Sequence, residues 1–316
     1  MRYLVTGCAG FVGSSLVDRL LSQGHQVVGI DNFSTGFERF LADASRNEAF
    51  RLVRGDLLDP RTSGDAMEGV DLVFHFAANA DVRFGTDHPR KDFEQNTLVT
   101  LNVLDAMRAA GTKRIAFSST GSIYGEASVI PTPEDAPIPI QTSLYGASKM
   151  SAEAFIEASC EGFGLQAYIF RFVSLLGERY THGHVIDFYR QLARHPAYLD
   201  VLGDGHQRKS YLYIGDCIDA MLHAIASAHE PVNVFNLGTD EYCEVRDSIG
   251  WIVSAMGVSP EIRFAGGKRG WIGDNPFIFL DTKKIRSLGW QPTLTIRAAV
   301  ENTVDFLERF ETSPDA

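Results

Sequence analysis

The chain has 316 residues, of which 45% are hydrophobic and 22% are charged, as in ordinary globular enzymes. A formal net charge of −11 argues against a nucleic acid as partner, because a basic face is needed to hold its backbone. No apolar run is long enough to span a membrane, and the first residues are typical of a core strand, so we expect a cytoplasmic protein. The four cysteines lie far apart without a C-x-x-C pair, which predicts neither a zinc site nor a disulfide framework.

The chain opens with the pattern of a strand, a glycine-rich turn and a helix. Residues 3–5 are apolar like a buried strand, and residues 14–21 carry apolar side chains at helical spacing. In such a turn the first glycine permits the bend, the second lets backbone N–H groups approach a pyrophosphate, and the third lets the helix pack on the strand. The expected cofactor contacts of this turn are Gly7, Gly10, Phe11, Val12 and Gly13.

A second apolar strand, residues 26–30, ends in Asp31, roughly 20 residues after the glycines. A carboxylate at this place accepts a hydrogen bond from a ribose 2′-hydroxyl and repels a 2′-phosphate, so NAD is favoured over NADP. The turn-like segment that follows is expected under the adenosine half of the cofactor. Its expected contacts are Asn32, Ser34, Thr35 and Gly36.

The third and fourth predicted strands supply further contacts near their carboxyl ends. Residues 50–57 end in Asp56, which either accepts a hydrogen bond from the adenine amine or caps the next turn, and in Leu57. Residues 71–78 form a buried strand in which His75 is expected to be a hydrogen-bonded core histidine. In an open α/β sheet the ligand crevice lies outside the strand ends, so this strand end is expected to line it. The residues concerned are Phe76, Ala77 and Ala78 for the cofactor and Asn79 for the substrate.

Hydroxyl groups gather at the end of a fifth predicted strand. An amphipathic helix over residues 93–110, which carries Asn96, precedes that strand, and the strand leads into Ser118 and Thr120. A proline-rich loop then ends where helical spacing resumes, with Tyr145 and Lys149 on one helix face. A cation beside a phenol favours the phenolate, and a positively charged nicotinamide favours it further. Tyr145 and Lys149 at this spacing could instead be an ordinary pair on a helix surface. The hydroxyl-rich strand end and the glycine turn favour the interpretation that they are catalytic.

Strands and helices alternate through residues 166–172 without a repeat, which predicts an α/β fold with one doubly wound parallel Rossmann sheet. From about residue 175 the pattern becomes mixed, with short strands and turns, and it predicts a smaller α/β C-terminal lobe. We expect an NAD-binding domain over residues 1–173 with a return segment at about 210–237. The smaller lobe is then expected over residues 174–209 and 238–316.

Together these motifs resemble the extended short-chain dehydrogenase/reductase family, in particular its nucleotide-sugar epimerase branch, which contains the UDP-galactose 4-epimerases. The resemblance covers nearly the whole chain. It extends from the G-x-x-G-x-x-G turn and Asp31 through Asp56-Leu57, the Ser-Ser-Thr strand end and Tyr145-x-x-x-Lys149 to Gly203-Asp204-Gly205, Arg208, Tyr213-x-x-Asp216 and Leu288-Gly289-Trp290-x-Pro292. The resemblance implies an NAD cofactor, a UDP-sugar substrate and a homodimer formed by helices near residues 93–110 and 151–162.

The resemblance also implies individual roles. Tyr145 would be the acid/base, Lys149 would hold the nicotinamide ribose and tune the tyrosine, and Thr120 would bond the sugar 4-hydroxyl. Arg208 and Arg269 would clamp the diphosphate with their forked donors. Phe172 joins the expected cofactor contacts. The expected substrate contacts are Asn79, Arg83, Thr120, Ser122, Tyr145, Ser174, His184, Val185, Arg208, Arg269, Asp274 and Ile278.

Two positions favour epimerisation over related reactions. Dehydratases of this family carry Asp-Glu after the threonine and decarboxylases a Glu two residues after it, whereas this chain has Gly121 and Ser122. We therefore expect a UDP-hexose 4-epimerase that acts through a transient 4-keto sugar, with UDP-glucose and UDP-galactose as first substrates. Departures at Ala80, Ser174 and Ile278, together with Arg83, leave UDP-N-acetylglucosamine and UDP-glucuronate open. A nucleotide-sugar reductase or dehydrogenase and a noncatalytic NAD-binding protein are the remaining alternatives.

Overall fold

The computed structural model of the chain describes residues 1–81, 85, 87–138, 140–267, 270, 275 and 277–311. These residues form two compact units. The first consists of Met1–Ile123, Ser143–Arg171 and Met221–Phe235. The second consists of Tyr124–Thr142, Phe172–Ala220 and Asn236–Ala316.

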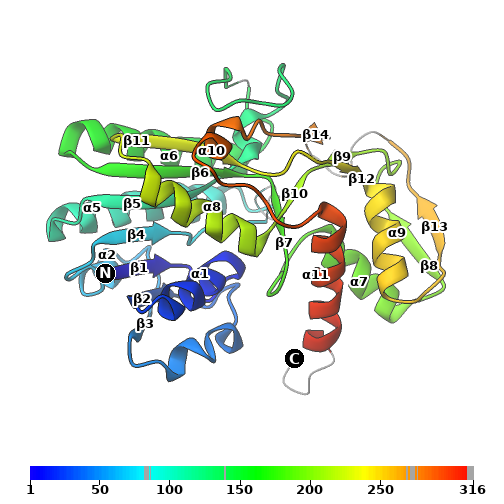
Figure 1. The fold of residues 1–316 in the computed structure, drawn as a ribbon, viewed down its shortest axis with the longest axis horizontal. Helices are drawn as coiled ribbons and strands as arrows, with labels where there is room; N and C mark the ends of the chain where they lie inside the picture. Colours follow the sequence, from blue (N-terminus) through cyan, green and yellow to red (C-terminus); the bar gives the residue numbers. More distant parts are fainter. Residues whose placement is uncertain are drawn as a thin grey trace. The chain divides into compact units, whose positions relative to one another are not determined.

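The first unit is built on a seven-stranded parallel sheet with the order β11-β6-β5-β4-β1-β2-β3 (Figure 1). The strands are β1 (Arg2–Thr6), β2 (Gln26–Asp31), β3 (Phe50–Arg54), β4 (Leu72–His75), β5 (Arg114–Thr120), β6 (Gln166–Phe172) and β11 (Val232–Leu237). Central strands such as β1 and β4 are apolar and buried along nearly their whole length, as expected where helices cover both faces of a sheet. The predicted doubly wound sheet is confirmed, and its order reverses between β1 and β4, where ligand crevices form.

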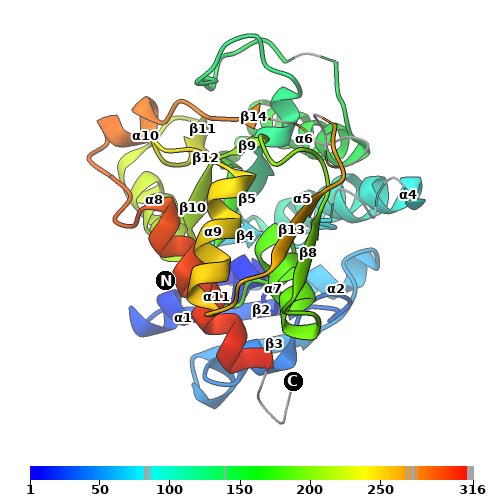
Figure 2. The same cartoon turned by 90° about the vertical axis from the view of Figure 1, so that its right-hand side faces the viewer.

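Helices cover both faces of this sheet. Helices α2, α5 and α6 pack on one face and α1 lies on the other (Figure 2). The helices of this unit are α1 (Phe11–Ser22), α2 (Pro60–Gly64), α4 (Pro89–Asp92), α5 (Val99–Ala110) and α6 (Leu144–Phe163), with short turns η1 (Glu38–Leu41), η2 (Ala44–Arg46) and η4 (Gly121–Tyr124). The helix expected over residues 93–110 begins instead as a π-helical segment, η3 (Phe93–Leu98), which continues into α5. No helix in the described ranges is long and apolar enough to cross a membrane.

The second unit is a mixed α/β assembly of three small sheets. Strands β7 and β10 pair, β8 and β13 pair, and β9 lies between β12 and β14. Helices α7, α9 and α11 contact one another. The elements are β7 (Ser174–Leu176), α7 (His184–Arg194), β8 (Tyr198–Val201), β9 (Arg208–Lys209), β10 (Tyr211–Tyr213), β12 (Cys243–Glu244), α9 (Val245–Ala255), β13 (Glu261–Phe264), β14 (Phe277–Ile278), α10 (Lys283–Ser287) and α11 (Ile296–Glu311), and α8 (Ile214–Ser227) runs from this unit into the first.

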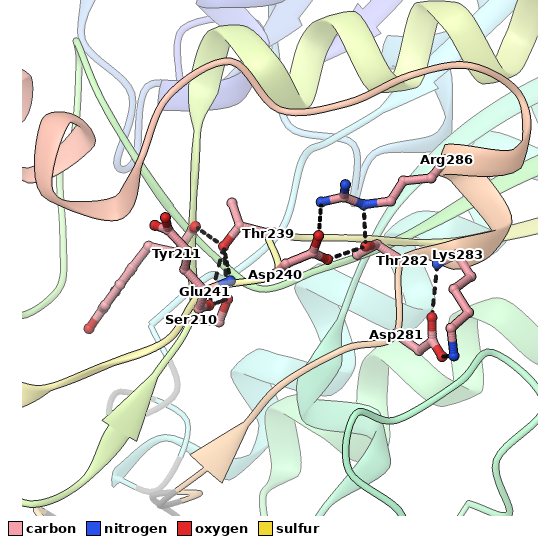
Figure 3. Close-up of polar contacts among 9 residues, drawn as sticks. All are labelled: Ser210, Tyr211, Thr239, Asp240, Glu241, Asp281, Thr282, Lys283 and Arg286. Atoms are coloured by element: carbon pink, nitrogen blue, oxygen red, sulfur yellow. Dashed lines mark hydrogen bonds and ion pairs between the residues drawn. The ribbon is translucent and has the colours of Figure 1, made fainter.

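A polar network holds the turn between β11 and β12 in the second unit (Figure 3). The backbone N–H of Glu241 donates to Thr239 Oγ1 at 3.3 Å, and Ser210 Oγ donates to the Glu241 carbonyl at 2.8 Å. On the other side of the turn, Arg286 of α10 forms an ion pair with Asp240 at 2.8 Å. The network therefore joins α10 and the segment that contains β9 and β10 to one turn.

Candidate active site

The glycine turn has the close packing that a pyrophosphate site requires. Gly7 has a φ of 67°, and a Cβ there would lie 2.8 Å from the backbone nitrogen of Ala77. A Cβ on Gly13 would lie 2.0 Å from the Gly7 carbonyl oxygen, so neither position accepts a side chain. The N-cap residue of α1 is Gly10, which has no side chain to accept hydrogen bonds from the first turn. The turn therefore presents backbone N–H groups at a helix N-terminus, which suits a dinucleotide phosphate.

Asp31 ends β2 as a buried carboxylate with 8% of its surface exposed. Its Oδ2 accepts a hydrogen bond from the Ala9 N–H and its Oδ1 accepts one from the Phe33 N–H, both at 2.8 Å. Burial raises the pKa of this carboxyl, and the backbone donors oppose the rise. Each carboxylate oxygen can accept a second hydrogen bond, so the site fits the ribose hydroxyls of NAD.

Asp56 caps the turn that follows β3. Its Oδ1 accepts a hydrogen bond from the Leu58 N–H at 2.8 Å, and its Oδ2 accepts one from Asn32 Nδ2 at 3.1 Å. The capping interpretation of Asp56 therefore holds, and the adenine contact stays a prediction. The neighbouring Leu57 side chain belongs to the hydrophobic core, so a cofactor contact at Leu57 would come from its backbone.

The three expected catalytic residues come together in the first unit, at the end of β5 and in the first turns of α6. The Thr120 hydroxyl accepts a hydrogen bond from the Ser122 N–H at 3.1 Å and is hydrogen-bonded to the Tyr145 hydroxyl. The Lys149 ammonium donates to the Ser118 carbonyl at 2.8 Å and lies 4.7 Å from the ring centroid of Phe117. An ammonium has three donors, so Lys149 has the capacity to bind a ribose as well.

Burial dominates the electrostatics of this pair. It raises the pKa of Tyr145 to about 12, an effect that the Thr120 hydrogen bond opposes and the charge of Asp92 increases. It lowers the pKa of Lys149 to about 7, and the charges of Glu153 and Asp92 oppose that fall. The expected depression of the Tyr145 pKa by Lys149 is thus not seen in this structure, because desolvation of the phenol outweighs the other effects.

The sequence-based interpretation missed a buried ion pair below Lys149. Glu153, one helical turn further along α6, pairs with Arg171 of β6 at 2.7 Å, with side chains only 4% and 6% exposed. Ser119 Oγ also donates to Glu153. The available sequence signal was a carboxylate four residues after Lys149, a spacing that places both on the same helix face. The Glu153 carboxylate raises the pKa of Lys149 and so favours its ammonium form.

His75 is a core histidine, as expected from the apolar run around it. Its Nδ1 lies 2.8 Å from Thr6 Oγ1, and its Nε2 lies 3.0 Å from Thr100 Oγ1. The Thr100 hydroxyl donates to the Asn96 carbonyl, so His75 Nε2 must carry the ring proton and donate it. Burial lowers the His75 pKa to about 3, which keeps the ring neutral. The prediction for His75 is therefore confirmed.

In the second unit, two adjacent side chains present polar groups suited to a ligand. Arg208 of β9 is exposed, and its guanidinium lies 4.0 Å from the ring centroid of Phe277. Gln207 was not predicted. It is 5% exposed, and among the described residues neither its Oε1 nor its Nε2 has a hydrogen-bond partner. A buried amide without partners is costly, so Gln207 fits a nucleotide-side contact.

Other expected substrate contacts differ in what they can offer. The ring nitrogens of His184 lie 2.8 Å from Ser248 Oγ and 3.2 Å from the Tyr211 hydroxyl, and the Val185 side chain is fully buried. A contact of either residue with substrate would therefore come from the backbone at the N-terminus of α7. Ser174 is exposed, whereas Phe172 and Ile278 are half-buried. Arg83, Arg269 and Asp274 lie outside the described residues.

Metal ligands do not gather in the part of the chain that the structure describes, where no group of three or more His, Cys, Asp or Glu side chains is placed to hold an ion. The four cysteines are buried free thiols. Burial raises the pKa of the Cys160 thiol to about 11 and that of the Cys243 thiol to about 12, which makes them unreactive.

The Rossmann sheet, the glycine turn, the buried acid after β2 and the Tyr-x-x-x-Lys pair define a dinucleotide-binding enzyme of the short-chain dehydrogenase/reductase type. The model of the NAD dependent epimerase/dehydratase family matches residues 3–238, and the chain belongs to this family. The resemblance seen in the sequence is thereby confirmed, as is NAD as the cofactor.

Relatives of known activity match along nearly the full chain. The UDP-glucose 4-epimerase of Mycolicibacterium smegmatis is 32% identical over 312 residues, which are 97% of this chain and 98% of the relative. A solved UDP-galactose 4-epimerase has 37% identity and a TM-score of 0.89, and the match covers 99% of this chain and 100% of that one. A UDP-glucuronic acid 4-epimerase from Bacillus cereus, solved with UDP-glucuronic acid and NAD, has 27% identity and a TM-score of 0.90 over 98% of this chain and 99% of that one.

Proposed function

We propose that this chain is an NAD-dependent UDP-hexose 4-epimerase, an isomerase whose first substrates are UDP-glucose and UDP-galactose. The observation that carries the proposal is that Thr120, Tyr145 and Lys149 come together at the end of β5 and the start of α6, in the unit that contains the dinucleotide turn. Epimerase relatives that match along the whole chain support the same activity.

The roles of the residues follow from their contacts. Bound NAD supplies the group that takes a hydride from the sugar C4 and returns it. Tyr145, as phenolate, accepts the proton of the 4-hydroxyl and later gives it back, so no net proton is consumed. Thr120, whose oxygen is held by the Ser122 N–H, orients the 4-hydroxyl beside Tyr145. Burial opposes ionisation of Tyr145, and the positive charges of Lys149 and of a bound nicotinamide would favour the phenolate. Lys149 would also bind the cofactor ribose. Inversion then requires only that the transient ketone receive the hydride on its other face.

The two residues after Thr120 favour epimerisation over elimination or decarboxylation. Gly121 and Ser122 stand where related enzymes carry an acid, and Ser122 uses its backbone N–H to hold the threonine hydroxyl. Without an acid from this strand end, nothing there protonates a leaving group at the neighbouring carbon. The 4-keto sugar is therefore reduced again.

The nucleotide part of the substrate is assigned to the second unit, and the cofactor and the reacting 4-hydroxyl of the sugar are assigned to the first. Arg208 offers forked donors that suit a diphosphate, and the unpartnered amide of Gln207 suits a nucleotide base or ribose. The proposed substrate is a UDP-sugar. The proposed assembly is a homodimer formed through α5 and α6. The glucuronate and N-acetylglucosamine forms are the alternative substrates.

Proton NMR of the purified protein with UDP-glucose, UDP-N-acetylglucosamine or UDP-glucuronate in separate tubes tests the proposal. We expect the anomeric signal of the 4-epimer to grow with UDP-glucose until equilibrium is reached, with no net gain of NADH. If the 4-epimer signal grew only with UDP-N-acetylglucosamine or only with UDP-glucuronate, the protein would still be a 4-epimerase, but with that sugar as its substrate. Net cofactor reduction would indicate a dehydrogenase, and no change in any tube after addition of NAD would overturn the proposal.

A further inference from the structure

Asp92 is a buried carboxylate that the proposed reaction does not use. It ends α4 with 1% of its surface exposed. Its Oδ1 accepts a hydrogen bond from Asn79 Nδ2 at 2.7 Å, whereas its Oδ2 has no hydrogen-bond partner within the described ranges. A Cβ on Gly85 would lie 1.9 Å from Oδ2, so the chain covers this oxygen at a distance that only glycine permits. A buried carboxylate with one oxygen left without a hydrogen bond raises the free energy of the folded protein, so its presence calls for a structural or functional reason.

A chain of hydrogen bonds joins Asp92 to the helix turn that bears Tyr145. The Asn79 side chain holds Asp92, and the Asn79 backbone N–H donates to Asn96 Oδ1 at 2.8 Å. Asn96 Nδ2 then donates to Ser148 Oγ at 2.9 Å. Ser148 Oγ donates in turn to the Tyr145 carbonyl at 2.8 Å. Asn96 lies in the π-helical segment η3, which places its side chain between the loop after β4 and α6.

The charge of Asp92 acts on both members of the catalytic pair. It raises the pKa of Tyr145 and also that of Lys149. Burial raises the pKa of Asp92 itself, while the Asn79 hydrogen bond and the Lys149 charge oppose the rise and favour the carboxylate. Among the residues that the structure describes, Asp81 raises the Asp92 pKa and Glu153 raises that of Lys149, while the nearby His75 is neutral.

We propose that Asp92 is a positioning residue for the Tyr145–Lys149 pair. Its hydrogen-bonded chain through Asn79, Asn96 and Ser148 holds the first turn of α6. Its charge, with that of Glu153, favours the ammonium form of Lys149. The half-satisfied carboxylate thus has a reason in the buried ammonium that its charge favours. The proposal rests on the catalytic roles assigned above to Tyr145 and Lys149.

The pH profile of Asp92→Asn tests this role, because an amide keeps an oxygen for Asn79 and removes only the charge. Activity requires the Tyr145 phenolate and the Lys149 ammonium, so the two limbs of the kcat profile report the ionisation of this pair as a unit. Since loss of a nearby negative charge lowers the pKa of both groups, we expect both limbs to move about one pH unit toward acid. A lower kcat with unmoved limbs would mean a merely structural role and would overturn the proposal.

Glu94→Gln is the matched control. It removes the same charge two residues further along, from a side chain that is 30% exposed and paired with Arg90. Its pH profile should equal that of the wild type. If Glu94→Gln moved the limbs as far as Asp92→Asn, the effect would be one of overall charge and the proposal would fail. If Asp92→Asn does not fold, Asp92→Ser removes the charge with a smaller side chain and carries the same expectation.

A second readout needs no substrate. Tyrosinate absorbance of the NAD-loaded enzyme is titrated with and without Tyr145→Phe, and the difference reports ionisation of Tyr145 alone. We expect this ionisation at lower pH in the Asp92→Asn background than in the wild type, and an equal or higher pH would contradict the proposal. If the wild type epimerises none of the three sugars, the proposed function fails, while this titration still decides the role of Asp92.

Discussion

At the scale of single residues, the Tyr145 hydroxyl is the group on which the proposed chemistry depends. Replacing Tyr145 by Phe keeps the ring and its packing and removes only the proton carrier. Acid/base groups of this kind contribute about 10²- to 10⁴-fold, so we expect Tyr145→Phe to lower turnover by about 10³-fold. NMR measures the turnover, and the NAD released on denaturation shows whether the cofactor site is intact.

Tyr168→Phe is a suitable comparison for that experiment. Tyr168 is a buried tyrosine of the first unit, and its hydroxyl donates to the Ala228 carbonyl at 3.0 Å. This variant should lose some stability and retain turnover. If Tyr145→Phe kept the turnover of the wild type, Tyr145 would not be the acid/base. If the variant contained no NAD, its lower turnover would instead indicate damage to the cofactor site.

At the scale of secondary structure, the start of α6 determines how Tyr145 is presented. Ser143 is its N-cap, and its hydroxyl accepts a hydrogen bond from the Gly146 N–H at 3.0 Å. We expect Ser143→Ala to lower the free energy of unfolding by about 1 kcal/mol, the usual effect of a lost cap. Denaturant unfolding measures it, and Ser143→Asp, which keeps an acceptor, should lose much less. Equal losses in the two variants would show that the cap contributes nothing.

Elements with strong local patterns were predictable from the sequence, and elements that depend on packing were not. The glycine turn, the apolar strands and the Tyr145–Lys149 spacing each have a local physical cause. The π-helical start of residues 93–98 does not, because it contains Asn96, whose side chain donates a hydrogen bond to Ser148, 52 residues further along the chain. Asp92 likewise lies among charged residues that suggest an exposed helix, and only the fold buries it.

In the second unit, too, contacts that depend on packing could not be predicted from local sequence patterns. Arg208 was proposed from its resemblance to a family motif, and its role stays a prediction. The buried amide of Gln207 beside it carries no sequence signal that separates it from a surface glutamine. The His184 ring pairs with Ser248, 64 residues away in the chain, which no local pattern could indicate. Sequence patterns thus predict which residues belong to a site better than they predict which of their atoms remain available to a ligand.

At the scale of the whole molecule, the outer face of α5 and α6 is the surface proposed for the homodimer. Phe155 and Phe163 are 43% and 47% exposed on α6, and with Leu101 and Leu104 of α5 they line one hollow. A charge placed there would be buried without a partner on association, so Phe155→Asp should yield monomers at concentrations where the wild type is a dimer. Sedimentation velocity measures the mass of each species. Phe37→Asp, which changes a phenylalanine that is 37% exposed elsewhere on the first unit, should leave the dimer intact. A monomeric wild type would refute the proposed assembly, and a dimeric Phe155→Asp protein would place the interface on another face.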